Sequence, residues 1–139
     1  MQPAPLTAIL IVEDETLVAM DIIDCITEAG YQAVGPIATL PEAVHIGRVG
    51  VFDAALLDAN LGGETVDEVA AELTKRNIPF AFVTGYAPET LPAAFQHVPL
   101  VRKPYDHEQL KQVVSNLLTR HESADALAPH AKSGGAEKS

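Results

Sequence analysis

AILIVEDE, residues 8–15, is the stretch that decides the fold, because five apolar residues without alternation run directly into three acids. An unbroken apolar run of this length indicates a strand that is covered on both faces, as in a parallel sheet. Similar runs follow along the chain, namely AALL at residues 54–57, PFAFV at residues 79–83 and LV at residues 100–101. Each run is followed closely by a polar side chain. The chain therefore predicts parallel strands that carry reactive groups at their carboxyl ends.

Amphipathic segments lie between the predicted strands. One helix face is marked by apolar residues that recur at helical spacing before the stop at Gly30. These residues are Val18, Ile22, Cys25, Ile26 and Ala29. A second short strand is expected at residues 32–35, followed by a helix from residue 39 to about residue 46. Further helices are expected near residues 66–73 and over residues 106–119, where the amphipathic pattern is clearest.

The segment between Pro88 and Pro99 carries only a weak helical pattern. Because Pro92 lies inside it, any fourth helix is expected to be short or irregular. Five strand-then-helix units in alternation predict an α/β fold, with right-handed crossovers and helices on both faces of the sheet. We therefore expect a doubly wound five-stranded parallel sheet of the flavodoxin-like type, with the strand order 2-1-3-4-5.

The composition describes one acidic domain. The chain has 139 residues with 19 acids and 9 bases, for a formal net charge of −10, and its single cysteine excludes an internal disulfide. No basic run offers a nucleic-acid footprint, and no apolar stretch approaches the length of a membrane span. Residues 1–7 lack the features of a signal peptide, so we expect a cytoplasmic protein. We expect residues 1–7 to be an extension, residues 8–120 the folded domain and residues 121–139 a disordered tail.

The polar groups at the strand ends suggest a binding site, because ligands of such sheets bind at the carboxyl ends of the strands. Glu13 and Asp14 follow the first strand and Asp58 follows the third. Converging carboxylates repel one another by roughly 4 kcal/mol per pair at about 4 Å and an effective dielectric of about 20. A divalent cation, with Lys103 opposite, removes this repulsion. Magnesium suits such a site, since it prefers one or two carboxylates together with water and a phosphate oxygen.

A carboxylate, a magnesium ion, a hydroxyl and a lysine together make a phosphoryl-transfer site. In this hypothesis Asp58 attacks phosphorus to form an aspartyl phosphate. The magnesium ion, the hydroxyl of Thr84 and the ammonium of Lys103 neutralise or bond the phosphoryl oxygens. Glu15 is expected to be only a first-turn acid that favours the helix dipole. Cys25 is expected in the core, and the five histidines, which show no metal-ligand spacing, at the surface.

From about residue 7 to residue 120 the chain resembles the receiver domain of two-component response regulators. The resemblance rests on an ordered set of residues at strand ends: Glu13-Asp14, Asp58, Thr84 and Lys103-Pro104. It implies that Asp14 is a direct metal ligand and that Glu13 acts on the metal through water. It implies that Asp58 is both a metal ligand and the phosphoacceptor. The backbone carbonyl of Asn60 would be the third protein ligand.

A narrower resemblance lies in PFAFVTGY, residues 79–86. It is similar to the FAT GUY receivers, whose motif reads Pro-Phe-x-Phe-Ala-Thr-Gly-Tyr, and it departs from that motif only at Val83. The resemblance implies a histidine kinase of the HWE or HisKA2 type as the partner. Leu100 stands where many receivers carry a Tyr or Phe that rotates inward on phosphorylation. We therefore hypothesise that Tyr86 and the segment 87–98 report phosphorylation instead.

The leading hypothesis is a single-domain response regulator of a two-component system or phosphorelay. It would take its phosphoryl group from a histidine kinase or a phosphotransfer protein, and act through protein contacts or as a phosphate sink or shuttle. Helix 106–119 and the loop before it are the expected docking face. The only chemistry expected is its own phosphotransfer and autodephosphorylation. No output domain is expected after residue 120.

Two alternatives remain open. A phosphohydrolase of the haloacid-dehalogenase type would use the same aspartyl-phosphate chemistry. The resemblance to such enzymes would require an Asp-x-Asp motif, in which the second acid protonates the leaving group. Here Asn60 stands at that second position, so turnover of alkyl phosphates should be poor without a general acid. A receiver used only as a binding scaffold, without phosphorylation, is hard to reconcile with the complete set of acids, threonine and lysine.

Overall fold

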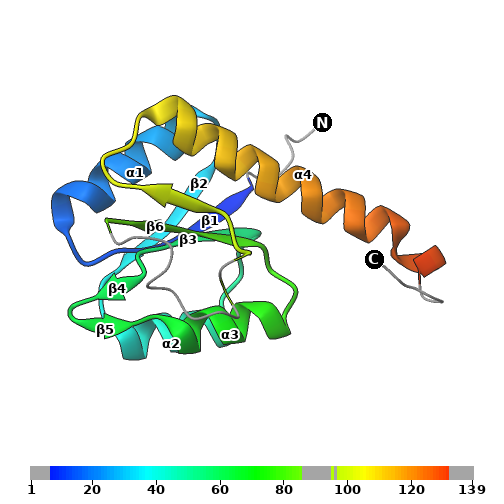
Figure 1. Ribbon diagram of the computed structural model, residues 1–139, viewed down its shortest axis with the longest axis horizontal. Coiled ribbons are helices and arrows are strands. Elements are labelled where there is room, and N and C mark those ends of the chain that lie inside the picture. Colours follow the sequence, from blue (N-terminus) through cyan, green and yellow to red (C-terminus); the bar gives the residue numbers. More distant parts are fainter. Residues whose placement is uncertain (1–6, 86–94, 96, 132–139) are drawn as a thin grey trace, which may run out of the picture.

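The computed structural model describes residues 7–85, 95 and 97–131 of the chain. Its centre is a five-stranded sheet made of β1 (Ala8–Val12), β2 (Gln32–Ile37), β3 (Ala54–Leu57), β6 (Phe80–Thr84) and β7 (Leu100–Arg102). The strand order is β2-β1-β3-β6-β7, and every neighbouring pair is parallel (Figure 1). Counted along the chain, these are strands 2-1-3-4-5, so the predicted topology is confirmed.

Helices cover both faces of the sheet. They are α1 (Thr16–Glu28), α2 (Leu40–Val49), α3 (Asp67–Lys75) and α4 (His107–Ala131). Helices α1 and α4 lie on one face, and α2 and α3 on the other (Figure 1). This layering follows from the alternation of strands and helices, because parallel strands must be joined by crossovers that run over a face of the sheet. Within the described residues, no helix is long and apolar enough to cross a membrane.

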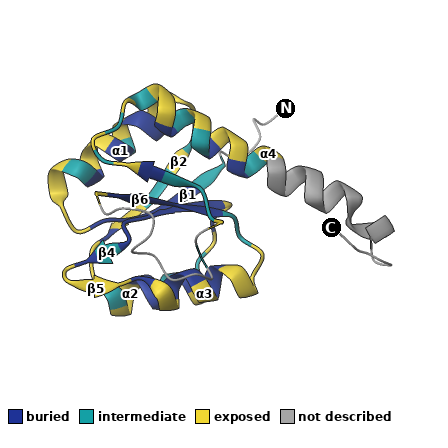
Figure 2. Cartoon of the chain, in the orientation of Figure 1, coloured by how far each residue is buried: buried dark blue, intermediate teal, exposed yellow. Residues whose placement is uncertain are grey.

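The central strands are buried on both sides. Leu10 and Val12 pack in the core under α2 and α3, whereas Ile9 and Ile11 pack in the core under α1 and α4. Successive side chains of a strand point to opposite faces, so a strand covered on both faces must be apolar throughout. Figure 2 shows these buried strands between helices that are exposed on their outer sides. Cys25 is fully buried in the core under α1 and α4, as predicted.

Helix α4 differs from the prediction at its carboxyl end. The expected helix ended near residue 119 and the expected disordered tail began at residue 121, but α4 continues to Ala131. A helix that has already formed extends at little cost per residue. The segment that extends it, residues 120–128, contains several residues of high helix propensity, among them alanines, Arg and Glu. The rest of the predicted tail, residues 132–139, lies outside the described residues.

A short antiparallel hairpin follows β3 and was not expected from the sequence. Its strands are β4 (Asn60–Leu61) and β5 (Glu64–Thr65). The two turn residues between them, Gly62 and Gly63, have φ angles of 60° and 89°. Positive φ at both central residues is typical of a type I′ turn, which glycine adopts without a steric penalty. The hairpin begins two residues after Asp58, the predicted site residue at the end of β3, and it lies beside the end of the sheet (Figure 1).

The segment between β6 and β7 is described only in part. Phe95 packs edge to face against Phe80 and Phe82, with ring centroids 6.4 and 6.2 Å apart. These contacts join it to the core under α2 and α3. The short helix predicted between Pro88 and Pro99 falls mainly on residues outside the described part of the chain, and Tyr86 lies there too.

Candidate functional site

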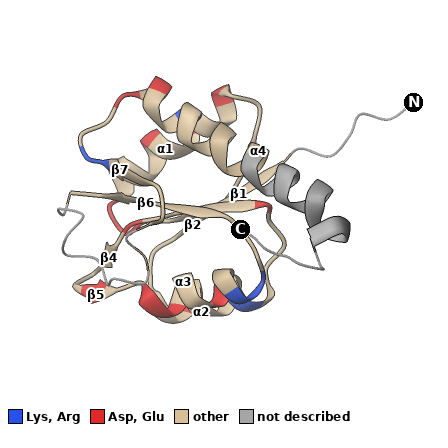
Figure 3. Ribbon diagram, turned by 45° about the vertical axis from the view of Figure 1, so that its right-hand side comes forward, with Lys and Arg blue, Asp and Glu red and all other residues tan. Residues whose placement is uncertain are grey.

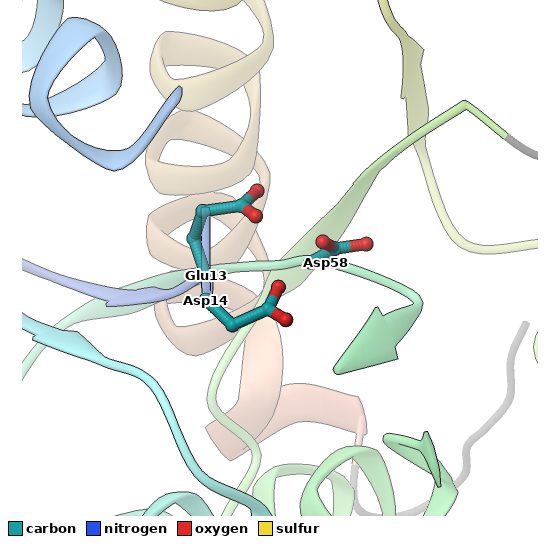
Figure 4. A group of neighbouring side chains, drawn as sticks. All are labelled: Glu13, Asp14 and Asp58. Atoms are coloured by element: carbon teal, nitrogen blue, oxygen red, sulfur yellow. The ribbon is translucent and has the colours of Figure 1, made fainter. Parts of the chain in front are cut away.

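Three acids meet at the carboxyl ends of β1 and β3. Glu13 and Asp14 directly follow β1, and Asp58 directly follows β3, which pairs with β1. One carboxylate oxygen from each residue lies within 4.8 Å of the other two. Figure 4 shows the three side chains beside one another at this edge of the sheet. The structure thus brings together the acids that the sequence predicted as a cluster, and their oxygens could hold a metal ion.

Glu13 is the most deeply buried of the three acids, with a relative exposure of 2%. Its Oε2 accepts a hydrogen bond of 3.1 Å from the backbone N–H of Glu15. Its Oε1 lies 3.1 Å from Nζ of Lys103, an ion-pair distance, but among the described residues this oxygen has no partner with hydrogen-bond geometry. Burial, and next the neighbouring carboxylate of Asp58, raise the pKa of Glu13 to about 7. A positive partner at this edge is therefore favourable.

Asp58 and Asp14 are held by backbone N–H groups. Asp58 is 6% exposed, and its Oδ1 accepts a hydrogen bond of 3.1 Å from the N–H of Asn60. Asp14 is exposed, and its Oδ2 accepts a hydrogen bond of 3.0 Å from the N–H of Gly62 at the hairpin turn. The side chain of Asn60 accepts a bond of 3.0 Å from the N–H of Gly63 within the same hairpin. The hairpin thus fixes the orientation of both carboxylates.

Lys103 supplies the positive charge at this edge. It follows β7, and its Nζ lies 3.1 Å from Glu13, 3.1 Å from Glu15 and 3.4 Å from Asp58. Burial acts to lower the pKa of Lys103, but the surrounding carboxylates, Glu13 and Asp58 foremost, outweigh this and raise it. Figure 3 shows the basic segment after β7 at the same edge of the sheet as the acidic strand ends. Lys103 is therefore a permanently charged member of the cluster.

Thr84 is the last residue of β6 and is fully buried. Its backbone carbonyl accepts a hydrogen bond of 2.9 Å from the N–H of Lys103, which joins the ends of β6 and β7. Leu100 opens β7 at the other end of that strand and is half-buried. It packs against the core that contains Phe82, under α2 and α3. Thr84, which is bonded to Lys103, therefore lies at the edge where the acids converge, whereas Leu100 lies at the opposite end of β7.

Three contacts of this region were not predicted from the sequence. Glu15, expected to be a first-turn acid, stands at the N-cap of α1 and pairs with Lys103. Asp21 of α1 pairs with Nε2 of His107 at 2.9 Å and accepts a hydrogen bond of 3.1 Å from the Tyr105 hydroxyl. Each contact joins residues more than eighty positions apart. No local pattern in the sequence could have revealed them.

Comparisons with known proteins agree with this arrangement. The family model of the response regulator receiver domain matches residues 9–115. The regulator PhyR of Methylorubrum extorquens is 32% identical over 132 residues, which are 89% of this chain and 48% of that protein. The chain spans less than half of the length of the curated relatives it matches.

Solved structures show the same likeness. SdrG from Sphingomonas melonis is 38% identical with a TM-score of 0.72, and the match covers 81% of this chain and 97% of that one. The response regulator PhyR from Brucella abortus is 32% identical with a TM-score of 0.76, covering 91% of this chain and 53% of that one. With the sheet order, the strand-end acids and the family match in agreement, the chain belongs to the response regulator receiver domain family.

Proposed function

We propose that this receiver accepts a phosphoryl group on Asp58. The observation that carries the proposal is the approach of the Lys103 ammonium to within 3.4 Å of Asp58, beside the acids Glu13 and Asp14. A transferring phosphoryl group carries negative charge on its oxygens and needs fixed positive charge around it. Lys103 provides that charge on one side, and an acidic cluster that recruits a cation provides it on the other.

In the proposed reaction a carboxylate oxygen of Asp58 attacks the phosphorus of a phosphohistidine or of a small phosphodonor. The new P–O bond forms as the bond from phosphorus to the leaving atom breaks, and the leaving group keeps the bonding electrons. Lys103 neutralises one phosphoryl oxygen and the Thr84 hydroxyl hydrogen-bonds another. The backbone N–H of Asn60 donates a hydrogen bond to Oδ1 of Asp58 and keeps this nucleophile oriented.

Magnesium is the cation that we propose for the acidic cluster. The donors are oxygens, as hard cations require, and the buried Oε1 of Glu13 is without a hydrogen bond among the described residues. Asp14, Asp58 and the carbonyl of Asn60 would hold the ion, with Glu13 acting through water. When bound, the ion would neutralise charge on the phosphoryl oxygens.

A histidine kinase or a phosphotransfer protein is the proposed donor, and the FAT GUY resemblance favours a kinase of the HWE or HisKA2 type. We propose that the output is a protein contact or a role as phosphate sink. One relative, PhyR from Bartonella quintana, is an anti-anti-sigma factor, which supports output through a protein partner. The surface around the start of α4 and the loop before it is the proposed docking face, because this loop begins directly after Lys103.

Tyr86 and the segment 87–98 are proposed to report phosphorylation, since Leu100 has no hydroxyl and packs against the core. The test compares amide hydrogen exchange in this segment with and without beryllofluoride, a phosphoryl mimic. Greater protection in the presence of the mimic is expected. Identical protection in both states would contradict the proposal.

The central test is incubation with a phosphodonor and magnesium, followed by measurement of the intact mass. We expect the native chain to gain one phosphoryl group and Asp58→Ala to gain none. Asp53→Asn is a matched control, because Asp53 is an exposed acid at the other end of the same strand, β3. Equal incorporation in the native chain and in Asp58→Ala would overturn the proposal.

The phosphohydrolase alternative gains no support. The family match is to receivers, and Asn60 stands where the general acid of such an enzyme is needed. The backbone N–H of Asn60 donates a hydrogen bond to Asp58, and its side-chain oxygen accepts one from the N–H of Gly63 in the turn. Rapid release of phosphate from a panel of phosphomonoesters would reverse this judgement.

A further inference from the structure

Lys103 contacts buried carboxylates of the site and one exposed carboxylate, that of Glu15. Its Nζ donates hydrogen bonds to Oε1 of Glu15 at 3.1 Å and to Oδ2 of Asp58 at 3.4 Å. An ammonium has three protons, and three carboxylates, those of Glu13, Glu15 and Asp58, already surround this one, so a further anion must displace one of them. The bond to Glu15 is the shorter of the two. An acid outside the predicted site therefore shares the charge of Lys103 with Asp58.

The side chain of Glu15 is directed at this lysine rather than at its own helix. Glu15 occupies the N-cap position of α1 with extended backbone angles, φ −85° and ψ 112°, and makes no side-chain capping bond within the described chain. Its backbone N–H is bonded to Oε2 of Glu13, which fixes the position of the residue beside the site. The backbone thus anchors Glu15 while its carboxylate is aimed at Nζ of Lys103.

The three carboxylates around Lys103 differ in how easily they release it. The side chain of Glu15 is 63% exposed, whereas those of Glu13 and Asp58 are 1% and 7% exposed. Water can solvate Glu15 when the lysine leaves, but a buried carboxylate that loses its cation is left uncompensated. Glu15 is therefore the partner that Lys103 exchanges first when a stronger anion arrives.

We propose that Glu15 is a positioning residue that holds the Lys103 ammonium at the solvent side of the site and competes with the phosphoryl group on Asp58 for it. The inference rests on the proposed function of Asp58. Its consequence is that Glu15 sets how strongly Lys103 stabilises the phosphoryl oxygens. Removing the charge of Glu15 leaves the lysine free to bind them, and the site should then hold a phosphoryl mimic more tightly.

The test is the affinity of the full chain for beryllofluoride at saturating magnesium, compared between the native chain and Glu15→Gln. We expect the variant to bind beryllofluoride more tightly by roughly two- to fivefold, a change in affinity that corresponds to the free energy of one exposed ion pair. The gain should shrink in high salt, because an exposed ion pair is screened there. A merely structural role of Glu15 would not produce this salt dependence.

Glu28→Gln is the matched control. Glu28 is the last residue of α1, its side chain is 64% exposed, and its Oε1 lies 3.3 Å from Nζ of Lys111. Like Glu15 and Lys103, this pair joins an exposed glutamate to a lysine, but it lies away from the acidic cluster. We expect beryllofluoride affinity in this variant to equal that of the native chain.

A second measurement separates this inference from the proposed function. The ¹⁵N shift of the Lys103 ammonium, read by NMR at fixed pH without any phosphoryl mimic, should change in Glu15→Gln and not in Glu28→Gln. An unchanged shift, or beryllofluoride affinities that match in the two variants, would overturn the role of Glu15. Failure of the native chain to bind beryllofluoride at all, with the NMR result as expected, would instead contradict the proposed function of Asp58.

Discussion

The backbone N–H of Gly62 donates a hydrogen bond of 3.0 Å to Oδ2 of Asp14, across 48 positions of sequence. Gly62 lies at the turn of the β4–β5 hairpin, and Asp14 lies in the loop after β1. Asp14 is the exposed member of the acidic cluster, so this bond from the hairpin is what restrains its carboxylate. The hairpin is therefore part of the site and not only a connection between β3 and α3.

Gly62→Ala is expected to weaken cation binding. The φ angle of 60° disfavours a side chain, so alanine would distort the turn and move the N–H that holds Asp14. We expect magnesium affinity, measured by calorimetry, to fall by roughly tenfold, as for other groups that orient a metal ligand. Gly30→Ala is the control, because Gly30 also has a positive φ, 96°, but lies after the carboxyl end of α1, away from the hairpin. Equal losses in both variants would contradict this role of Gly62.

Arg76→Ala is expected to lower the free energy of unfolding by about 2 kcal/mol, since Arg76 makes charged hydrogen bonds to backbone carbonyls. Its guanidinium donates to the carbonyls of Gly47 and Gly50 at 2.7 Å each and lies 5.5 Å from the ring centroid of Phe52. It thereby ties the end of α3 to the end of α2. Urea unfolding measures the change. Lys75→Ala removes an exposed lysine from Glu72, whose carboxylate keeps its ion pair with Arg48, and should cost less than about 1 kcal/mol. A loss as large as that of Arg76→Ala would refute the distinction.

His107 should make part of the stability depend on pH. The hydrogen bond to Asp21 is the main cause that raises the pKa of His107 in the folded chain. Its contribution is therefore fully present below the unfolded pKa of about 6.5, and it is lost as the pH rises through the higher folded pKa. Asp21 has a lowered pKa, so its own contribution is lost only as the pH falls through that lower folded value.

The measurement compares unfolding free energies of the native chain and of His107→Gln at about pH 5.5 and about pH 8.5. The native chain should exceed the variant by more at the lower pH. The groups facing His107 are Asp21 and Glu28 of α1, Lys111 of α4 and the Tyr105 hydroxyl that shares Asp21. His45→Gln, at an exposed position on α2, is the control. A difference that does not change with pH would rule out the pairing as its source.

A chain that ends at residue 120 should keep its stability. Among the α4 residues whose side chains the structure describes, those that pack in the core under α1 and α4 lie between Leu110 and Leu118. Deleting residues 121–139 is therefore expected to change the free energy of unfolding by no more than about 0.5 kcal/mol. Leu110→Ala removes a fully buried side chain and should cost about 2–5 kcal/mol. A large loss on truncation would place stabilising contacts beyond residue 120.

The local features of the sequence determined the elements and their order. Apolar runs such as Ala8–Val12 and Ala54–Leu57 identify buried strands, because a parallel strand between two helical layers has no polar face. The acids that end these runs must meet at one edge, since parallel strands share their direction. The convergence of Glu13, Asp14 and Asp58 was therefore predictable from the sequence alone.

The tertiary structure alone decided which partners these groups have. Lys103 reaches Glu15 across 88 positions because the loop after β7 lies beside the start of α1. Asp21 reaches His107 across 86 positions because α1 and α4 pack on the same face of the sheet. The Gly62 turn meets Asp14 because the hairpin folds beside β1. Such contacts depend on helix packing and loop geometry, which bring together residues with no periodic relation in sequence. Local pattern thus placed the acids, and long-range packing determined the charges and hydrogen bonds that surround them.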